Sequence, residues 1–402
     1  MNAPDRKLDF SSVGYDEALE RARALIPFLR KHAPDNEKAT KLAPEVVGAL
    51  HETGLFRYLQ PKSWGGMELD FVAYFDIPEI LGRGDASTSW VVANLGSHHR
   101  GLAQWPREVQ EEIWGADPDV LIASGIAFMQ GTAHKVDGGL ELSGKWGFSS
   151  GVDHSEWEQL ACIVKDAEGK PIDWVMCQVP HADFQVIDDW QTLGMRGTGS
   201  RTVTCKNAFV PQHRVCSMQV ANPAHEYLGL RVNTNSMFKV PTASLGGHCI
   251  TGSMCGNATA MLELTTEMVK QRSTNYTGAK MRDFQSVQLR IGMAGAKIDA
   301  VRTWIRNDCI EAHNIYRAGG KLDIEAKLKY KRNSAAAMKL LTEAVDSLYE
   351  MCGAGGIYDS SPLQRIYRDQ HAAAGHFSFS TDAQLGPWAL VMVGGEFKSP
   401  TL

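Results

Sequence analysis

The chain has 402 residues, of which 44% are hydrophobic, and a formal net charge of −5 at pH 7. This composition supplies a sizeable core and excludes the disordered class, and the small negative charge gives no general reason to expect nucleic acid or an anionic membrane as a partner. We see no run of about 18 apolar residues and no signal-peptide pattern, so the sequence predicts neither a membrane span nor secretion. It therefore predicts a cytoplasmic location. The eight cysteines include no C-x-x-C pair, which predicts free thiols and no metal site.

Residues 1–119 are predicted to form an N-terminal helical domain. Apolar residues recur at helical spacing from Ala18 to His32, and Pro34 is expected to interrupt that helix. Pro44 fits the first turn of a second helix, which Gly54 should end. Two further apolar stretches, residues 71–81 and 87–102, are expected to be buried helices.

Residues 120–225 differ in pattern and are predicted to form a central β-domain. About seven short runs, such as Leu160–Val164 and Trp174–Val179, alternate with turn signals, as in a β-barrel or sandwich. Residues 226–402 contain long helical stretches with few breakers, which predict an antiparallel four-helix bundle. These stretches are 245–271, 285–318 and 324–352. The predicted fold class is α+β.

Three segments have residues suited to a flavin. The run 143–151 ends a strand with aromatic and hydroxyl side chains, which could stack on a flat ring and bond its edge, although an ordinary strand and turn would look similar. The run 193–202 places glycines and hydroxyls around Arg196, as at an anion site or in a solvated hairpin turn. Glycines 353, 355 and 356 follow a helix, so they form a helix end and not a dinucleotide-binding fingerprint.

Taken together and in this order, the three segments resemble the acyl-CoA dehydrogenase superfamily from about residue 20 to about residue 390. The resemblance implies that Phe148 stacks on the flavin ring and that the Ser150 hydroxyl bonds flavin N5. It also implies that Arg196 and Arg272 contact the cofactor, with Arg272 at a phosphate. The turn made by Gly353, Gly355 and Gly356 matches one that reaches the flavin of a neighbouring subunit, which implies a homotetramer.

The residues after Arg368-Asp369 depart from the dehydrogenase pattern. Dehydrogenases of this family commonly carry a glutamate base about eight residues beyond that pair, where this chain has Phe377. No carboxylate follows before Asp382, and loss of a general base costs about 10²–10⁴-fold in rate. The His376-Phe377-Ser378 run instead resembles the oxygenase components of two-component flavin monooxygenases that hydroxylate phenols.

Other positions agree with that branch and predict a substrate pocket. Trp90, His98 and Ser124 fall where the branch has aromatic, histidine and serine pocket residues, and Phe377 joins them. His376 or His98 would then orient or deprotonate the substrate. Simpler alternatives stay open from sequence: Trp90 could belong to the core, Ser124 could cap a turn, and the adjacent His99 could face the pocket instead of His98.

The resemblance therefore implies a flavin-dependent monooxygenase that hydroxylates a small aromatic compound of phenol or indole type. It would use reduced FAD or FMN, with FAD preferred, and O₂ as co-substrate, through a C4a-hydroperoxyflavin. Because no nicotinamide-binding βαβ unit is visible, a separate NAD(P)H-dependent flavin reductase should supply the flavin, by contact or by diffusion. Three alternatives remain: an acyl-CoA dehydrogenase or flavin oxidase, a sulfur or nitrogen monooxygenase on the same fold, and a noncatalytic flavin-binding protein.

Overall fold

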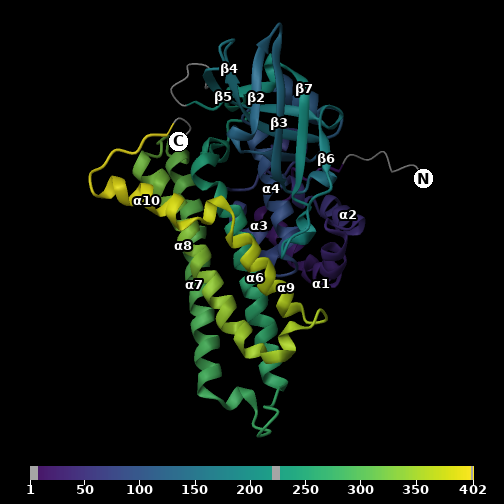
Figure 1. Ribbon diagram of the computed structural model, residues 1–402, viewed down its shortest axis with the longest axis vertical. Helices are drawn as coiled ribbons and strands as arrows, with labels where there is room; N and C mark the ends of the chain where they lie inside the picture. The colour runs from purple at the N-terminus through teal and green to yellow at the C-terminus, as the bar shows by residue number, and fades with distance from the viewer. Residues whose placement is uncertain (1–7, 220–226, 400–401) are drawn as a thin grey trace, which may run out of the picture.

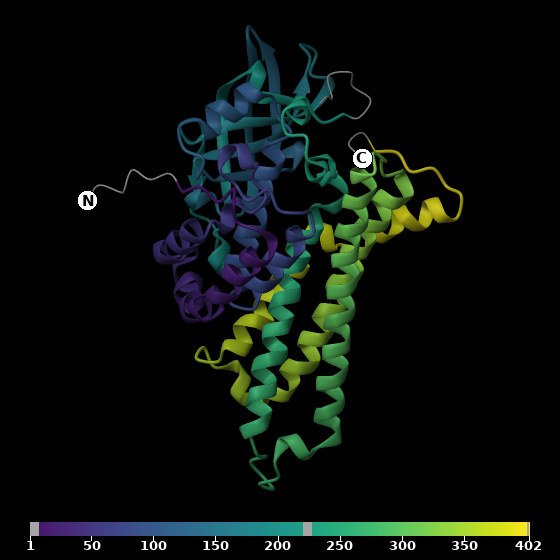
Figure 2. The same ribbon diagram turned by 180° about the vertical axis from the view of Figure 1, so that it is seen from behind.

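The computed structural model describes residues 8–219, 227–399 and 402, and its elements follow the helical–β–helical order predicted from the sequence. The sheet occupies one end of the molecule and the long helices extend from it toward the other end (Figure 1). The N-terminal helices lie beside the sheet and the adjoining half of the bundle (Figure 2). The predicted domain limit at residues 225–226 lies outside the described residues, and the limit at 119–120 stays a prediction.

The N-terminal helices match the prediction except at Pro34. They are α1 Tyr15–Ala39, α2 Pro44–Thr53, α3 Ala73–Gly82, α4 Ala86–Leu102 and α5 Arg107–Trp114. The predicted break is wrong, because α1 continues through Pro34 for another turn. Leu29, Ala33 and Asn36 are buried on one face of α1, and this burial offsets the roughly 3 kcal/mol cost of an internal proline. Gly54 ends α2 in the left-handed conformation, as predicted.

The central domain is one mixed sheet of eight strands in the order β6-β7-β3-β2-β4-β5-β8, with β1 paired to β4. The strands are β1 Ile122–Gly125, β2 Gly131–Val136, β3 Gly139–Ser149, β4 Trp157–Lys165, β5 Pro171–Pro180, β6 Gln185–Ile187, β7 Arg201–Pro211 and β8 Val215–Ser217. The pairings of β4 with β1 and β2 are parallel. The register between β3 and β7 shifts between Trp146 and Ser149, so the end of β3 bends where the flavin residues are predicted.

The C-terminal helices form the predicted antiparallel bundle (Figures 1 and 2). The bundle contains α6 Thr242–Gln271, α7 Gln285–Arg317, α8 Ile324–Tyr349 and α9 Pro362–Ala374. Helix α10 Thr381–Met392 lies across α8 at the end near the sheet (Figure 1). The predicted helix 324–352 ends three residues early, and a 3₁₀ stretch, Glu350–Ile357, follows it. Gly353 has a φ of 58° within this stretch, a conformation that glycine adopts without steric cost.

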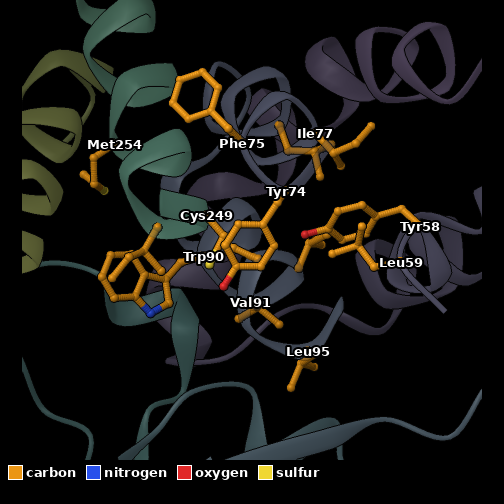
Figure 3. Close-up of a cluster of buried hydrophobic side chains, with 14 of the residues drawn as sticks. Tyr58, Leu59, Tyr74, Phe75, Ile77, Trp90, Val91, Leu95, Cys249 and Met254 are labelled. Atoms are coloured by element: carbon orange, nitrogen blue, oxygen red, sulfur yellow. The ribbon is translucent and has the colours of Figure 1, made fainter. Parts of the chain in front are cut away.

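Helices α3, α4 and α6 meet in a shared core that fixes the bundle against the N-terminal domain. Tyr74, Trp90 and Cys249 come from these three helices and lie together in it (Figure 3). Close approach of α3 and α6 requires Gly256, where a Cβ atom would lie 2.1 Å from the Glu79 carbonyl oxygen. The core positions the first turns of α4, and so Trp90, toward the sheet.

Three further properties follow from the described residues. All eight cysteines are free, and only Cys216 is not fully buried. No group of three or more histidine, cysteine or acidic residues within the described ranges is placed to hold a metal ion. None of the helices in the described part of the chain combines the length and the apolar character that crossing a membrane requires.

Candidate active site

A chain of hydrogen bonds links Ser150, a predicted flavin residue, to α4 and to the loop 193–200. The Trp90 indole N–H donates to the Ser150 hydroxyl at 3.2 Å, and Ser150 is 2.8 Å from the Ser200 hydroxyl. Ser200 lies 2.7 Å from the Thr198 hydroxyl, which donates to the Met195 carbonyl at 2.7 Å. Ser150 is therefore held in one place by α4 on one side and by the arginine-containing loop on the other.

Phe148 is presented to solvent at the end of β3. Its side chain is 74% exposed and its φ is 65°, a strained conformation for a residue other than glycine. Its ring lies nearly perpendicular to that of Trp190, with the centroids 6.0 Å apart. An exposed ring held by a strained backbone beside Ser150 is suited to stack on a planar ligand.

The loop 193–200 is fixed from the bundle by the Arg368-Asp369 pair. The buried Asp369 carboxylate accepts the Met195 backbone N–H at 2.6 Å, and Arg368 donates to the Leu193 carbonyl at 2.8 Å. Burial raises the pKa of Asp369 to about 7. Within this loop Arg196 is half-buried, and its buried Nε atom has no hydrogen-bond partner among the described residues, so this N–H is a candidate donor to an anionic ligand.

A cavity of about 550 Å³ lies next to this group, between the β-domain, α4 and the bundle. His98, Ser124, His376 and Phe377 line it, which brings together four residues that the sequence predicted from separate segments. Neither Ser150 nor any other predicted cofactor residue lines it. The cavity is thus the candidate substrate pocket, and Trp90 packs behind its wall against His376.

His98 has a hydrogen-bond pattern that leaves one ring nitrogen as an acceptor. Its Nδ1 atom is 2.6 Å from the Ile122 carbonyl oxygen, which can only accept, so Nδ1 carries the proton. Nε2 then accepts from the Ser124 hydroxyl at 3.1 Å. Burial lowers the pKa of His98 to about 4, which keeps the ring neutral at pH 7.

The neighbouring histidine does not share this cavity. His99 is buried, and its Nδ1 atom accepts from the Trp114 indole N–H at 3.1 Å. Its ring stacks on Trp114 with the centroids 5.8 Å apart. Of the two adjacent histidines, His98 is therefore the one that faces the cavity.

His376 has the opposite arrangement of its ring nitrogens. Its Nδ1 atom accepts the Ser378 backbone N–H at 3.1 Å, so in the neutral ring Nε2 carries the proton and can act as a hydrogen-bond donor. The ring lies edge-on to Trp90 and to Phe379, with centroid distances of 5.5 and 5.9 Å. Burial lowers the pKa of His376 to about 4.

The cavity also has polar groups that the sequence analysis missed. Gln159 on β4, Ser244 on α6 and Gln384 on α10 each line it and have a buried polar side-chain atom without a hydrogen-bond partner among the described residues. Buried polar atoms are normally paired, so these are candidate contacts for a ligand. No motif surrounds them, and only the fold brings them together.

Arg272 and the glycine turn form a second, separate group. The Arg272 guanidinium donates to the Cys352 carbonyl at 2.6 Å, and a Cβ atom at Gly353 would lie 3.4 Å from it. Helix α6 contacts α4 where Ser89 and Ser253 are 2.8 Å apart. Arg272 follows Ser253 by 19 residues, which places it roughly 28 Å farther along the helix. Within one chain the predicted cofactor residues therefore lie in two separate places, one at the end of β3 and one at the end of α6.

The residues present fit a flavin. The exposed Phe148 ring offers a stacking surface, Ser150 offers a fixed hydroxyl, and the Nε atom of Arg196 lacks a partner. These are the contacts that a flat, polar-edged, phosphorylated cofactor needs. A bound flavin would supply the activation of O₂ that no amino-acid side chain provides.

Comparisons with known proteins agree with this geometry. Models of the acyl-CoA dehydrogenase N-terminal and C-terminal domains match residues 19–116 and 248–381. The oxygenase subunit HsaA of a flavin-dependent monooxygenase from Rhodococcus jostii is 34% identical over 95% of this chain and 98% of its own. The oxygenase component of an FADH₂-dependent resorcinol hydroxylase from Rhizobium sp. is 29% identical, and the alignment covers 90% of both chains.

Solved structures show the same relationship. The crystal structure of 3-HSA hydroxylase from Rhodococcus sp. has a TM-score of 0.90 and 31% identity, covering 96% of this chain and 99% of its own. The structure of XiaF from Streptomyces sp. with FADH₂ and glycerol has a TM-score of 0.88 and 26% identity, covering 96% of this chain and 97% of its own.

Fold and site thus define a flavin enzyme of the acyl-CoA dehydrogenase type. The chain belongs to this family and, within it, to the oxygenase components of flavin-dependent monooxygenases.

Proposed function

We propose that this enzyme hydroxylates a small electron-rich aromatic compound, of phenol or indole type, with reduced FAD and O₂. The observation that carries the proposal is the cavity wall formed by His98 and Ser124. There the Ser124 hydroxyl donates a hydrogen bond to the neutral imidazole of His98. A phenol O–H or indole N–H placed at Ser124 could pass its proton to His98. Relatives in the same family include a p-hydroxyphenylacetate hydroxylase and an indole-3-acetate monooxygenase, which supports this substrate class.

The cavity disfavours the dehydrogenase alternative. No aspartate or glutamate side chain lines it in the described part of the chain, whereas removal of a proton next to a thioester needs a carboxylate base. Phe377, at the position of that base in dehydrogenases, is 68% exposed and lines the cavity. An apolar ring at this point favours an aromatic substrate over an acyl chain that must be deprotonated.

The two histidines have different roles in this proposal. His98 accepts a proton through Ser124, which increases the electron density of the substrate ring. His376 cannot accept at Nε2 while Nδ1 accepts the Ser378 N–H, so it donates a hydrogen bond to substrate or oxygen. Ser150 holds the flavin edge, and Trp90, His376 and Phe379 exclude water from that region.

Partners and assembly follow from the same reasoning. A separate NAD(P)H-dependent reductase supplies the reduced flavin, and the oxygenase acts as a homo-oligomer, a tetramer by family resemblance. Exposed apolar residues in the elements that adjoin Arg272 and the glycine turn support the assembly, since apolar patches on a surface commonly mark interfaces between proteins. They include Leu289, Met293, Ile357 and Tyr358. The free cysteines support a reducing compartment such as the cytoplasm.

The test is to mix the protein with chemically reduced FAD, O₂ and a panel of phenols and indoles, without any nicotinamide. We expect a product that contains one atom of labelled oxygen from O₂. Unsaturation of a thioester would instead identify a dehydrogenase, oxygenation of only sulfur or nitrogen compounds would identify the other monooxygenase class, and tight flavin binding without turnover would identify a noncatalytic protein. Consumption of NADH by this chain alone would contradict the need for a reductase.

A further inference from the structure

One end of the substrate cavity carries an excess of positive charge. Four lysines line it, Lys239, Lys321, Lys327 and Lys331, and no aspartate or glutamate side chain does so among the described residues. The chain as a whole has a net charge of −5, so this is a local excess of positive charge. Charges that line a cleft focus their field into it and attract ligands of opposite sign.

The lysines are not neutralised by neighbouring carboxylates. Lys331 donates from Nζ to the Ala243 carbonyl at 3.3 Å, and burial lowers its pKa. In the described ranges none of the four forms an ion pair. Leu402 also lines the cavity, and its terminal carboxylate forms no ion pair with them. By contrast, Lys329 on the same helix is bonded to Glu311 at 2.9 Å and does not line the cavity.

The position of the lysines along α8 shows which end of the cavity they occupy. Ser334 on α8 lies near the reacting end, because a Cβ atom added to Gly247 would touch both Ser334 Oγ, at 3.0 Å, and Ser378 Cβ, at 3.2 Å. Lys331 and Lys327 precede Ser334 by three and seven residues, or roughly 4.5 and 10 Å along the helix axis. The positive charge therefore increases with distance from His376.

We propose that Lys327 and Lys331, with Lys239 and Lys321, form an anion subsite, so that the substrate is an aromatic compound carrying a carboxylate on a short side chain. The ring would lie at His98, Ser124 and His376, and the carboxylate would reach the lysines. This inference rests on the proposed function, because it assumes that the cavity is the substrate site. The cavity volume of about 550 Å³ leaves room beyond a single ring.

The experiment measures binding, not turnover. Calorimetry would give the affinity of the flavin-loaded protein for p-hydroxyphenylacetate, indole-3-acetate and the neutral amide of each. We expect each carboxylate to bind about tenfold or more tightly than its amide, which corresponds to about 1.4 kcal/mol. The K327Q/K331Q double variant should lose this preference, and higher salt should reduce it. The K329Q variant is the matched control and should keep it.

Each other outcome overturns the proposal. A wild-type protein that binds no carboxylate more tightly than its amide has no anion subsite, and a preference that persists in the double variant has another source. A double variant with weaker affinity for reduced FAD would show that the lysines serve the cofactor phosphates instead. Failure of the proposed function is separately visible, because it would appear as absence of oxygen incorporation from O₂ with every substrate, whatever the binding preference.

Discussion

The residues predicted around the flavin and the substrate fall into two groups with opposite character. The near group, Trp90, Phe148, Ser150 and His376, is held by hydrogen bonds and ring contacts within one chain. The distal group, Arg272 and Gly353, lies roughly 28 Å farther along α6, amid exposed apolar side chains such as Ile357. The near group is thus formed within a single chain, whereas the distal group, predicted to hold the far end of the cofactor, faces outward, as the proposed homo-oligomer requires.

The largest effect on hydroxylation is expected from a change at His98, which lies beside the near group. His98→Ala removes the acceptor behind Ser124, and we expect the hydroxylation step to slow by about 10²–10⁴-fold because a general base is lost. Affinity for reduced FAD should not change. Single-turnover product formation and flavin titration measure the two effects, and His99→Asn is a control that should retain the base. Hydroxylation at the parent rate would show that His98 is not the base.

The complementary change is in the distal group. Arg272→Ala should weaken binding of reduced FAD by about ten- to a hundredfold, since hydrogen bonds to a charged group contribute about 1.5–3 kcal/mol. At saturating flavin the rate of hydroxylation should be that of the parent. Arg282→Ala, an exposed arginine paired with Asp283, is the matched control. Unchanged FAD affinity in a correctly assembled Arg272 variant would remove the distal group from the site.

A smaller effect is expected at Ser150. Ser150→Ala removes one hydrogen bond, so FAD affinity should fall by less than about tenfold, which reflects about 0.5–1.5 kcal/mol. Loss of the hydroxyl at the flavin edge should increase the hydrogen peroxide released for each product molecule formed. Ser155→Ala is a control in the same loop, because among the described residues the Ser155 hydroxyl bonds the Gly151 carbonyl alone. Equal coupling of oxygen to product in both variants would argue against Ser150 at N5.

The smallest effect concerns pH. Burial lowers the pKa of both His98 and His376 to about 4, below the usual value near 6.5. Between these values the unfolded chain binds more protons than the folded one, so the free energy of unfolding should decrease as pH falls from about 6.5 to about 4. Denaturant titration of wild type and His376→Gln measures this, and the variant should show the smaller decrease. Above about pH 5 neither histidine should produce a step in the pH profile of hydroxylation.

The sequence predicted the order of the domains and four of the residues that line the cavity. His376, Phe377, His98 and Ser124 were recognised because each stands near a family landmark, and the structure places all four on one cavity. Pro34 was misjudged because local propensity takes no account of the buried face that keeps α1 intact.

Other features were beyond reach for a physical reason. Gln159, Ser244 and Gln384 are ordinary polar residues on three separate elements, and only the tertiary fold leaves their buried atoms without partners. The four lysines likewise come from the segment before α6 and from the region around the start of α8. A single sequence does not show which charges share a cavity. The roles of the two histidines also depended on hydrogen-bond partners that no motif encodes.

The hydrogen-bonded chain that runs from Trp90 through Ser150 and the 195–200 loop to Asp369 has a mechanical consequence. It joins α4, the sheet and α9, so rotation of any one of these bodies against the others would break at least one of its bonds. An oxygenase must nevertheless exchange spent flavin for reduced flavin in every cycle. We therefore expect exchange to proceed through movement at the outward-facing Arg272 end, with the three bodies remaining joined around Ser150.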